Sequence, residues 1–172
     1  MKALTSILLC FASFYSFGQL NKQVTLAATG HLLVKAKGSS LNDAGYGVNV
    51  GAALFARHKL QLLVETSGDW FVGNKLLKLD PQGREDKVAV MYSVKAGVQL
   101  FILRNIALSA TTGPAWHAIQ APGFTTTYGF RYSATGFWGQ RKRFVTQLFT
   151  VHTPKSTLMT QYIGLGLGYR IY

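Results

Sequence analysis

The sequence predicts an all-β protein, a single eight-stranded antiparallel up-and-down β-barrel, and three observations carry this prediction. Apolar residues alternate with small or polar residues along most of the chain, which is the period of an extended strand. Eight such segments can be laid down, and the connections between them alternate between long and short. Gly is abundant at 18 residues, Pro is scarce at 4, and Val, Thr, Tyr and Phe recur in short runs, a composition that favours sheet over helix. A chain of 172 residues has room for one such domain.

The N-terminal 18 residues have the pattern of a cleaved signal peptide. Lys2 forms a short basic start, an apolar run extends from Leu4 to Phe17, and the segment Ser16-Phe17-Gly18 places small residues where a signal peptidase reads them. We predict cleavage after Gly18, which leaves residues 19–172 as the barrel domain. A membrane anchor is the alternative, but the run is shorter than the roughly 20 residues of a helical span. Cys10 is the only cysteine and would leave with this leader, so the mature chain is expected to have no disulfide and no cysteine metal site.

The first three strands are expected at Val24–Ala36, Gly45–Arg57 and Lys59–Phe71. In each, large apolar residues occupy one face and small or polar residues the other, as in the second, where Tyr46 and Val48 alternate with Gly47 and Asn49. The polar loop Lys37–Asp43, a tight connection at His58 and the longest loop, Val72–Asp86, separate them.

The next three strands are expected at Lys87–Ile102, Ile106–Ala118 and Thr127–Gly139. The first of these has the cleanest alternation in the chain. After this strand the chain reverses direction in a short turn at Arg104-Asn105. Pro114 interrupts the following strand and predicts a bend or a bulge there. A loop through Ala121-Pro122-Gly123 leads to the sixth strand.

The last two strands are expected at Arg143–His152 and Leu158–Tyr172, after a short connection at Gln140–Lys142 and a loop at Thr153–Ser156. The facing of the seventh stays open, because Phe144 with Leu148 and Val145 with Phe149 both offer an apolar face. In the eighth, large apolar residues alternate with glycine in the run IGLGLGY. One face is therefore apolar and the other nearly empty, as a small, crowded barrel interior would require.

This facing predicts that the barrel spans a membrane. In a soluble, lipocalin-like barrel the large apolar face would point inward, and Gly, Ser and Thr would coat the surface. In a transmembrane β-barrel the same face contacts lipid, and aromatic residues near the strand ends, such as Tyr46, Trp70, Trp116 and Tyr169, form girdles. The soluble binder remains the alternative.

The inward faces carry charges that need partners. Glu65 and Asp69 are the only carboxylates in the expected strands, against cations that include Lys35, Lys95 and Arg131. Buried charges must be paired or hydrated. Pairing the third and fourth strands symmetrically about Asp80 places Glu65 opposite Lys95, so we expect an ion pair there within a polar plug. A proton relay through the same groups is the alternative.

Catalysis is the weaker interpretation of the polar residues on the inward faces. His31, His117, Ser67, Ser109 and Asp69 are available for a triad, but they form no recognisable local motif. His117 could approach Ser67 and Asp69 at one rim, yet their strands flank the fourth strand and do not touch. We expect His31 to be a hydrogen-bonded interior histidine. No cofactor or metal is expected.

The charge balance is strongly basic, with 18 Lys and Arg against 6 Asp and Glu and a formal net charge of +12. The cations form no aromatic-studded stripe of the kind that binds nucleic acid. They gather at strand ends, as in Arg57-His58-Lys59 and Arg141-Lys142-Arg143, and between Lys75 and Lys87. Such positive rims suit anionic lipid headgroups and lipopolysaccharide phosphates. The alternative is that the rim cations are only solvated and hold the barrel in place without binding a partner.

The tail GLGLGYRIY resembles the C-terminal strand of small bacterial outer-membrane β-barrels, including those of Bacteroidota. The leader ending in Phe-Gly-Gln resembles the leaders of the same proteins. In that family the terminal aromatic residue helps the barrel-insertion machinery to recognise the chain. The resemblance implies an assembly signal at Tyr169, Ile171 and Tyr172, although those tails usually place the aromatic residue where Ile171 stands here.

The sequence thus predicts an exported outer-membrane barrel with both termini in the periplasm. Short turns on one side and longer loops on the other are typical of such barrels. The expected role is non-enzymatic, either structural or in surface interaction, with the loops Val72–Asp86 and Ile119–Thr126 as the binding surface. An enzyme acting on lipid A and an accessory barrel of a secretion or uptake assembly are the alternatives.

Overall fold

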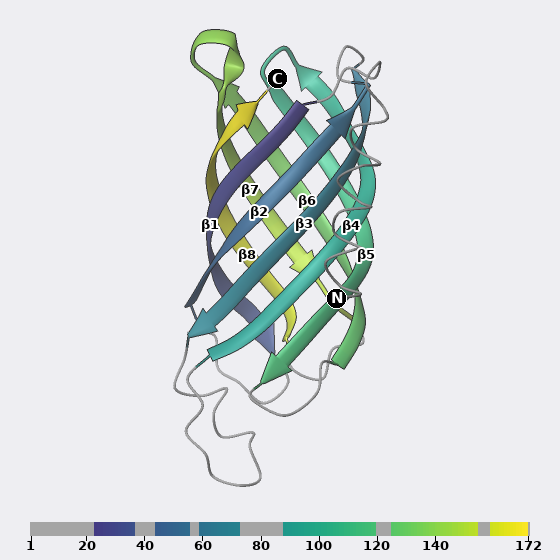
Figure 1. Ribbon diagram of the computed structural model, residues 1–172, viewed down its shortest axis with the longest axis vertical. Helices are drawn as coiled ribbons and strands as arrows, with labels where there is room; N and C mark the ends of the chain where they lie inside the picture. Colours follow the sequence, from purple (N-terminus) through teal and green to yellow (C-terminus); the bar gives the residue numbers. More distant parts are fainter. Residues whose placement is uncertain are drawn as a thin grey trace, which may run out of the picture.

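Eight antiparallel strands close into one barrel in chain order (Figure 1). The computed structural model describes residues 23–36, 44–55, 59–72, 88–119, 125–154 and 159–171. The strands are β1 (Gln23–Ala36), β2 (Ala44–Leu54), β3 (Leu60–Val72), β4 (Val88–Leu103), β5 (Ile106–Ile119), β6 (Thr125–Trp138), β7 (Phe144–His152) and β8 (Met159–Ile171), with a short 3-10 helix η2 (Gln140–Lys142) before β7. The predicted signal peptide and the loop Val72–Asp86 beyond Val72 lie outside the described residues. Among the helical residues described, none belongs to a helix with the length and hydropathy of a membrane span.

The first and last strands close the barrel. β1 pairs with β8 from Val24↔Ile171 to Ala36↔Met159, with irregular register only near Lys35. The remaining seven interfaces join strands that are consecutive in the sequence. Because each strand has a neighbour on both sides, closure leaves no edge strand to pair with another chain.

The predicted facing is confirmed where side chains are described. In β8, Leu165 and Leu167 are 67% and 71% exposed, whereas Tyr162 is 1% exposed on the inward face. In β7, Phe144 and Leu148 point outward, and the inward side is also apolar because it carries Val145, Phe149 and Val151. The ambiguity of this strand therefore has a physical basis, since both of its faces carry large apolar side chains.

Two strands end earlier than predicted, and in both cases a left-handed residue stops them. β2 ends at Leu54 and not at Arg57, because Phe55 takes a φ of 58°. β6 ends at Trp138 because Gly139 has a φ of 75°. Such a φ turns the backbone out of the extended conformation that ladder pairing needs.

Of the bend or bulge expected at Pro114, the register shift that would mark a bulge is not present. Pairing between β4 and β5 lapses opposite Gly113 and Pro114 and resumes in the same register, from Ala96↔Thr112 to Ser93↔Ala115. Proline lacks the N–H that the ladder needs, but here its loss interrupts the pairing without shifting it. The irregularity in this ladder lies instead at Phe101/Leu103, beside the Arg104-Asn105 turn.

The two ends of the barrel differ in their connections. The three short connections, after β2, β4 and β6, share one end with Gln23 and Ile171, and we call this the turn end; it is uppermost in Figure 1. The opposite end, where β1, β3, β5 and β7 finish, is the loop end. From these bounds the turn-end connections are residues 55–59, 104–105 and 139–143, and the loop-end connections are residues 37–43, 73–87, 120–124 and 153–158. The predicted alternation therefore holds for the first four connections and fails at 120–124, which is no longer than two of the turn-end connections.

Gly97 and Gly51 both lie on the inward face, but only at Gly97 does the backbone of the adjacent strand leave no room for a Cβ atom. A Cβ atom at Gly97 would lie 2.7 Å from Thr111 Cα and overlap Ala110 O, both backbone atoms, whereas one at Gly51 would meet nothing nearer than Leu63 Cδ1 at 3.6 Å. We expect Gly97→Ala to lower the free energy of unfolding by about 1–3 kcal/mol through overpacking.

Gly51→Ala is the matched control, and we expect it to leave stability unchanged or to raise it by a few tenths of a kcal/mol. Urea unfolding of both variants in the same detergent, followed by intrinsic fluorescence, measures the difference. Equal midpoints for the two variants would contradict the close approach of β4 and β5.

Candidate functional site: the polar interior

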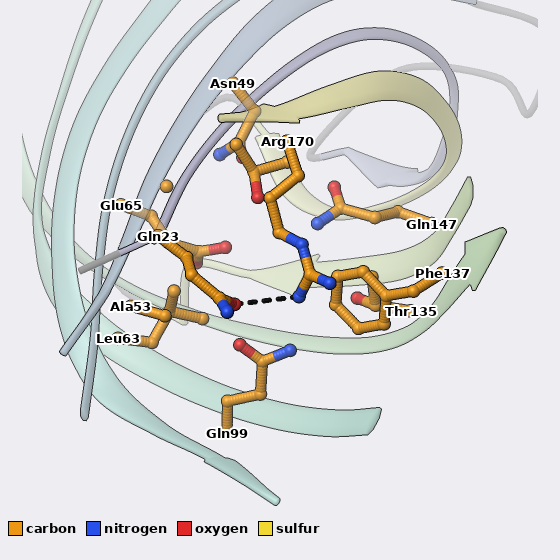
Figure 2. A pocket seen from close by; sticks show the side chains of 12 residues that line it. Gln23, Asn49, Ala53, Leu63, Glu65, Gln99, Thr135, Phe137, Gln147 and Arg170 are labelled. Atoms are coloured by element: carbon orange, nitrogen blue, oxygen red, sulfur yellow. Dashed lines mark hydrogen bonds between the residues drawn. The ribbon is translucent and has the colours of Figure 1, made fainter. Parts of the chain in front are cut away.

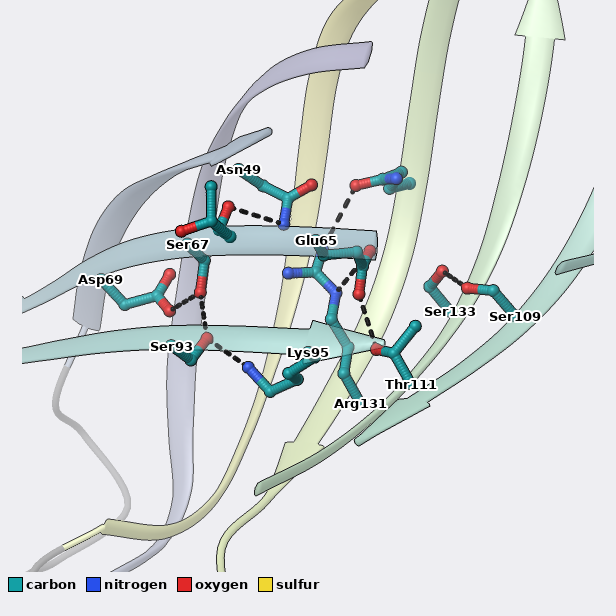
Figure 3. A network of polar contacts seen from close by, with 12 residues as sticks. Asn49, Glu65, Ser67, Asp69, Ser93, Lys95, Ser109, Thr111, Arg131 and Ser133 are labelled. Atoms are coloured by element: carbon teal, nitrogen blue, oxygen red, sulfur yellow. Dashed lines mark hydrogen bonds and ion pairs between the residues drawn. The ribbon is translucent and has the colours of Figure 1, made fainter. Parts of the chain in front are cut away.

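Four charged side chains lie inside the barrel near its middle. Glu65 and Asp69 on β3, Lys95 on β4 and Arg131 on β6 are 1–3% exposed. The charges balance in number, two of each sign, among hydroxyl and amide groups from neighbouring strands (Figure 3). This balance fits the general rule that buried charges persist only when they are paired and hydrogen-bonded.

Glu65 is the centre of the first half of this network. Its Oε2 accepts a hydrogen bond from Thr111 Oγ1 at 2.6 Å, and its Oε1 lies 3.8 Å from Arg131 Nε. The guanidinium also donates from Nη2 to Gln147 Oε1 at 3.2 Å and lies 4.0 Å from the ring centre of Phe149. Contacts from β3, β5, β6 and β7 therefore converge on one ion pair.

Asp69 is the centre of the second half. Its Oδ2 accepts hydrogen bonds from Ser67 Oγ at 3.0 Å and from the Tyr162 hydroxyl at 2.9 Å. Ser67 and Ser93 hydroxyls are 2.8 Å apart, and the Lys95 ammonium donates to Ser93 (Figure 3). A chain of hydroxyls thus connects the second cation to the second carboxylate.

The expected Glu65–Lys95 ion pair is replaced by a different one. The two residues do lie opposite each other in the β3–β4 register. Among the described contacts, however, the carboxylate pairs with Arg131 from β6, and the ammonium is directed to Ser93. Register considers only neighbours along the sheet, whereas a long side chain can reach across the narrow interior of an eight-stranded barrel. The side chain of Lys35 lies outside the described residues.

Several partners in this network were not identified from the sequence. Ser93, Thr111, Gln147 and Tyr162 complete it, and only the last carried a signal, as a large aromatic residue in line with the inward glycines of β8. Inward polar residues are common in barrels, so their identity alone did not distinguish these positions.

The turn end of the interior is filled by a third buried cation, Arg170 (Figure 2). Arg170 Nη1 donates to Gln23 Oε1 at 2.8 Å, and its guanidinium lies 4.2 Å from the ring centre of Phe137. Beside it is a cavity of about 20 Å³ that Gln99 and Gln147 also line. That volume suffices for an ordered water, but not for a solute.

The residues considered for catalysis do not assemble. His117 on β5 and Ser67 on β3 are separated by β4. Ser109 Oγ is hydrogen-bonded to Ser133 Oγ at 2.7 Å, and no hydrogen bond joins a serine hydroxyl to a histidine among the described residues. The same part of the chain contains no group of three or more His, Cys, Asp or Glu side chains placed to hold a metal.

His31 differs from the expectation of a hydrogen-bonded histidine. Its Nδ1 lies 3.9 Å from Asp69 Oδ1, which is beyond hydrogen-bond length, and neither ring nitrogen has a hydrogen-bond partner within the described ranges. The ring instead packs against Phe71 and Tyr162, with centroids 4.5 and 5.2 Å away. Its role in the structure is therefore packing around the Asp69 carboxylate.

Fold and interior together define a closed, side-chain-filled β-barrel, and the solved structures similar to it include outer-membrane barrels. Neisserial surface protein A (NspA) is 15% identical, with a TM-score of 0.64 over 87% of this chain and 96% of that one. Ail of Yersinia pestis, the attachment invasion locus protein, in complex with the heparin analogue sucrose octasulfate, is 14% identical, with a TM-score of 0.58 over 87% and 97%. The N-terminal β-barrel domain of Pseudomonas aeruginosa OprF is 13% identical, with a TM-score of 0.52 over 89% and 100%. The chain therefore has the fold of small eight-stranded outer-membrane barrels.

No model of a known protein family matches this sequence, and neither does any curated protein.

Removal of one charge from the Glu65–Arg131 pair is expected to destabilise the barrel strongly. In Glu65→Gln the guanidinium stays buried without its carboxylate, and loss of one partner of a buried pair costs about 3–5 kcal/mol. In Glu65→Gln/Arg131→Met the unpaired charge is gone, so we expect recovery of at least half of that loss. Urea unfolding of the single and double variants measures the coupling. Losses that simply add would contradict the ion pair.

Proposed function

We propose that this chain is a non-enzymatic outer-membrane β-barrel protein of a Gram-negative bacterium, exported by its signal peptide and active in surface interaction through its loops. The observation that carries the proposal is the combination of an apolar outward face with a filled interior. Leu165 and Leu167 on the outside are more than two-thirds exposed, as lipid-facing residues are. The interior holds an ion-pair network where a channel would need open space.

The orientation that we propose places the turn end and both termini in the periplasm. Short periplasmic turns and longer extracellular loops are the general rule for these barrels. The loop end then presents Val72–Asp86 and Ile119–Thr126 to the outside. The tail and the Phe-Gly-Gln of the leader support a source in Bacteroidota.

The charges of the longest loop support a polyanionic partner at the cell surface. Four cations, Lys75, Lys78, Arg84 and Lys87, lie in or beside this loop against three carboxylates, Asp80, Glu85 and Asp86, an excess of one positive charge, and cations there suit lipopolysaccharide phosphates. That Ail was solved with a sulfated sugar analogue agrees with such a preference in this fold. An envelope protein that binds the loops, as in an accessory barrel of a larger assembly, would appear as stable co-purification.

Two measurements test location and orientation. We expect the protein to sediment with the outer membrane and to migrate faster on a denaturing gel before boiling than after it, because a closed barrel resists detergent. A single cysteine introduced at Gly83 should react with an impermeant maleimide in intact cells, whereas one at Asn105 should react only after lysis.

The native Cys10 would be lost with the leader, so these variants need no cysteine-free background. A soluble protein without a gel shift would overturn the membrane location and favour a secreted, lipocalin-like binder. Labelling at Asn105 alone in intact cells would invert the orientation.

The C-terminal residues are proposed to guide insertion. Tyr169 and Ile171 are outward on β8, at 40% and 58% exposure, and Tyr169 packs edge-on against Phe144. Tyr172 lies outside the described residues. Purified barrel-insertion machinery in vesicles should fold a chain without Ile171 and Tyr172 several times more slowly than the intact chain, followed by the gel shift. Unaided folding into detergent micelles is the control and should proceed equally for both. Equal rates with the machinery would remove the assembly signal from these residues.

A further inference from the structure

The interior cavity beside Arg170 is lined largely by polar side chains (Figure 2). Asn49 on β2, Glu65 on β3 and Gln99 on β4 line it from three neighbouring strands, and Arg170 lines it from β8. The cavity volume is about 20 Å³, which is enough for one ordered water. A cavity of this size binds water when two to four polar groups converge on it, so the hydrogen bonds of these side chains decide its occupant.

Asn49 presents an acceptor that has no donor. The residue is 1% exposed, and its side-chain Nδ2 donates to the carbonyl oxygen of Thr66 at 3.5 Å. Its Oδ1 is buried without a hydrogen-bond partner among the described residues. This oxygen lies 4.0 Å from the position that a Cβ atom would take on Gly51, which lines the same cavity. A buried carbonyl oxygen is costly without a donor, so a donor is expected in the cavity.

Glu65 brings a second acceptor to the cavity. Its Oε2 is hydrogen-bonded to Thr111, but the only described contact of its Oε1 is Arg131 Nε at 3.8 Å. That separation is longer than a hydrogen bond, and Arg131 Nε has no hydrogen-bond partner in the described ranges. A water commonly lies beside polar groups that are separated in this way. Two acceptors at one cavity need a group that donates two hydrogens, and water is such a group.

Gln99 supplies the donor that a water needs in return. Its side chain is 6% exposed and lines the cavity. It makes no hydrogen bond within the described contacts, and an amide nitrogen has two hydrogens to donate. Two donated bonds and one accepted bond make three, which is the usual number for a buried water.

The charges around the cavity favour a neutral occupant. Arg170 lies on its wall and Arg131 lies beside Glu65, and two guanidinium groups would repel a bound cation at this range. The Glu65 carboxylate would repel an anion in the same way. Water carries no net charge and avoids both costs.

We propose that one ordered water binds in this cavity, donates hydrogen bonds to Asn49 Oδ1 and Glu65 Oε1, and accepts one from Gln99 Nε2. The water gives Glu65 a third partner beside Thr111 and Arg131. It also joins β2 and β4 to a network that already connects β3, β5, β6 and β7. The inference requires the closed barrel but neither the proposed location nor the proposed partner, so folded protein in detergent micelles is sufficient to test it.

Nuclear magnetic resonance of the deuterated, folded protein with protonated amides tests the proposal. We expect Overhauser cross-peaks between water and the side-chain amide protons of Asn49 and Gln99. Their sign should differ between the laboratory and rotating frames, as it does for a long-lived bound water and not for proton exchange. Asn49→Leu is close in volume and removes the acceptor, so it should abolish the cross-peak of Gln99. Gln99→Leu should likewise abolish that of Asn49. The dispersion of the backbone amide spectrum shows whether each variant is folded.

Thr25→Val/Thr135→Val is the matched control. It removes the two hydroxyl groups that line the cavity and should leave both cross-peaks unchanged. Loss of the cross-peaks in this control would assign them to hydroxyl protons and overturn the water site. Their absence from the unmodified protein would overturn it directly. Spectra in sodium chloride and in choline chloride test for a cation. Amide shifts of Asn49 and Gln99 that depend on sodium, without water cross-peaks, would replace the water by a metal ion.

Discussion

Closure of eight strands into one sheet is the constraint from which the other features of this structure follow. In hydrocarbon, no water is available for exposed backbone N–H and C=O groups, so a spanning sheet must pair its first and last strands, here β1 with β8. Closure at eight strands leaves an interior that side chains fill. The glycine face of β8 is a direct consequence. A Cβ at Gly164 would lie 2.9 Å from His31 Cβ on the adjacent strand, which leaves no space for a larger residue.

The same narrow interior explains why its charges pair across the barrel. Arg131 on β6 reaches Glu65 on β3, and Tyr162 on β8 reaches Asp69, also on β3. These contacts join strands that are not neighbours in the sheet. Replacement of a buried ion pair by apolar residues can be neutral for stability. We therefore attribute to this network the selection of one strand register rather than a gain in stability. A register slip of one residue would move Glu65 and Asp69 to the lipid face.

The sequence was sufficient for the parts of the fold that depend on local alternation. Period-two patterns placed all eight strands and most of their facing, and symmetry about Asp80 placed Glu65 opposite Lys95. The Glu65–Arg131 contact could not be found in this way, because it depends on the distance across the barrel and not on adjacency. The early end of β2 at Phe55 was also unpredictable, since a left-handed φ at phenylalanine has no sequence signature. In β7, alternation failed because Phe149 faces an interior guanidinium that accepts an aromatic ring.

The distribution of charge separates three environments in this barrel. In the middle, two cations meet two carboxylates of the same chain. At the loop end, cations and carboxylates alternate in the sequence between β3 and β4. At the turn end, the described cations include those of η2, the residue after it and the β4–β5 turn, and Ile171 near the end of the chain lies at the same end of the barrel. Mutual repulsion in such a cluster destabilises the compact state unless counter-ions collect there. Dissolved salt supplies such counter-ions, so stability at the turn end should depend on ionic strength more than the stability of the buried ion pair in the middle does.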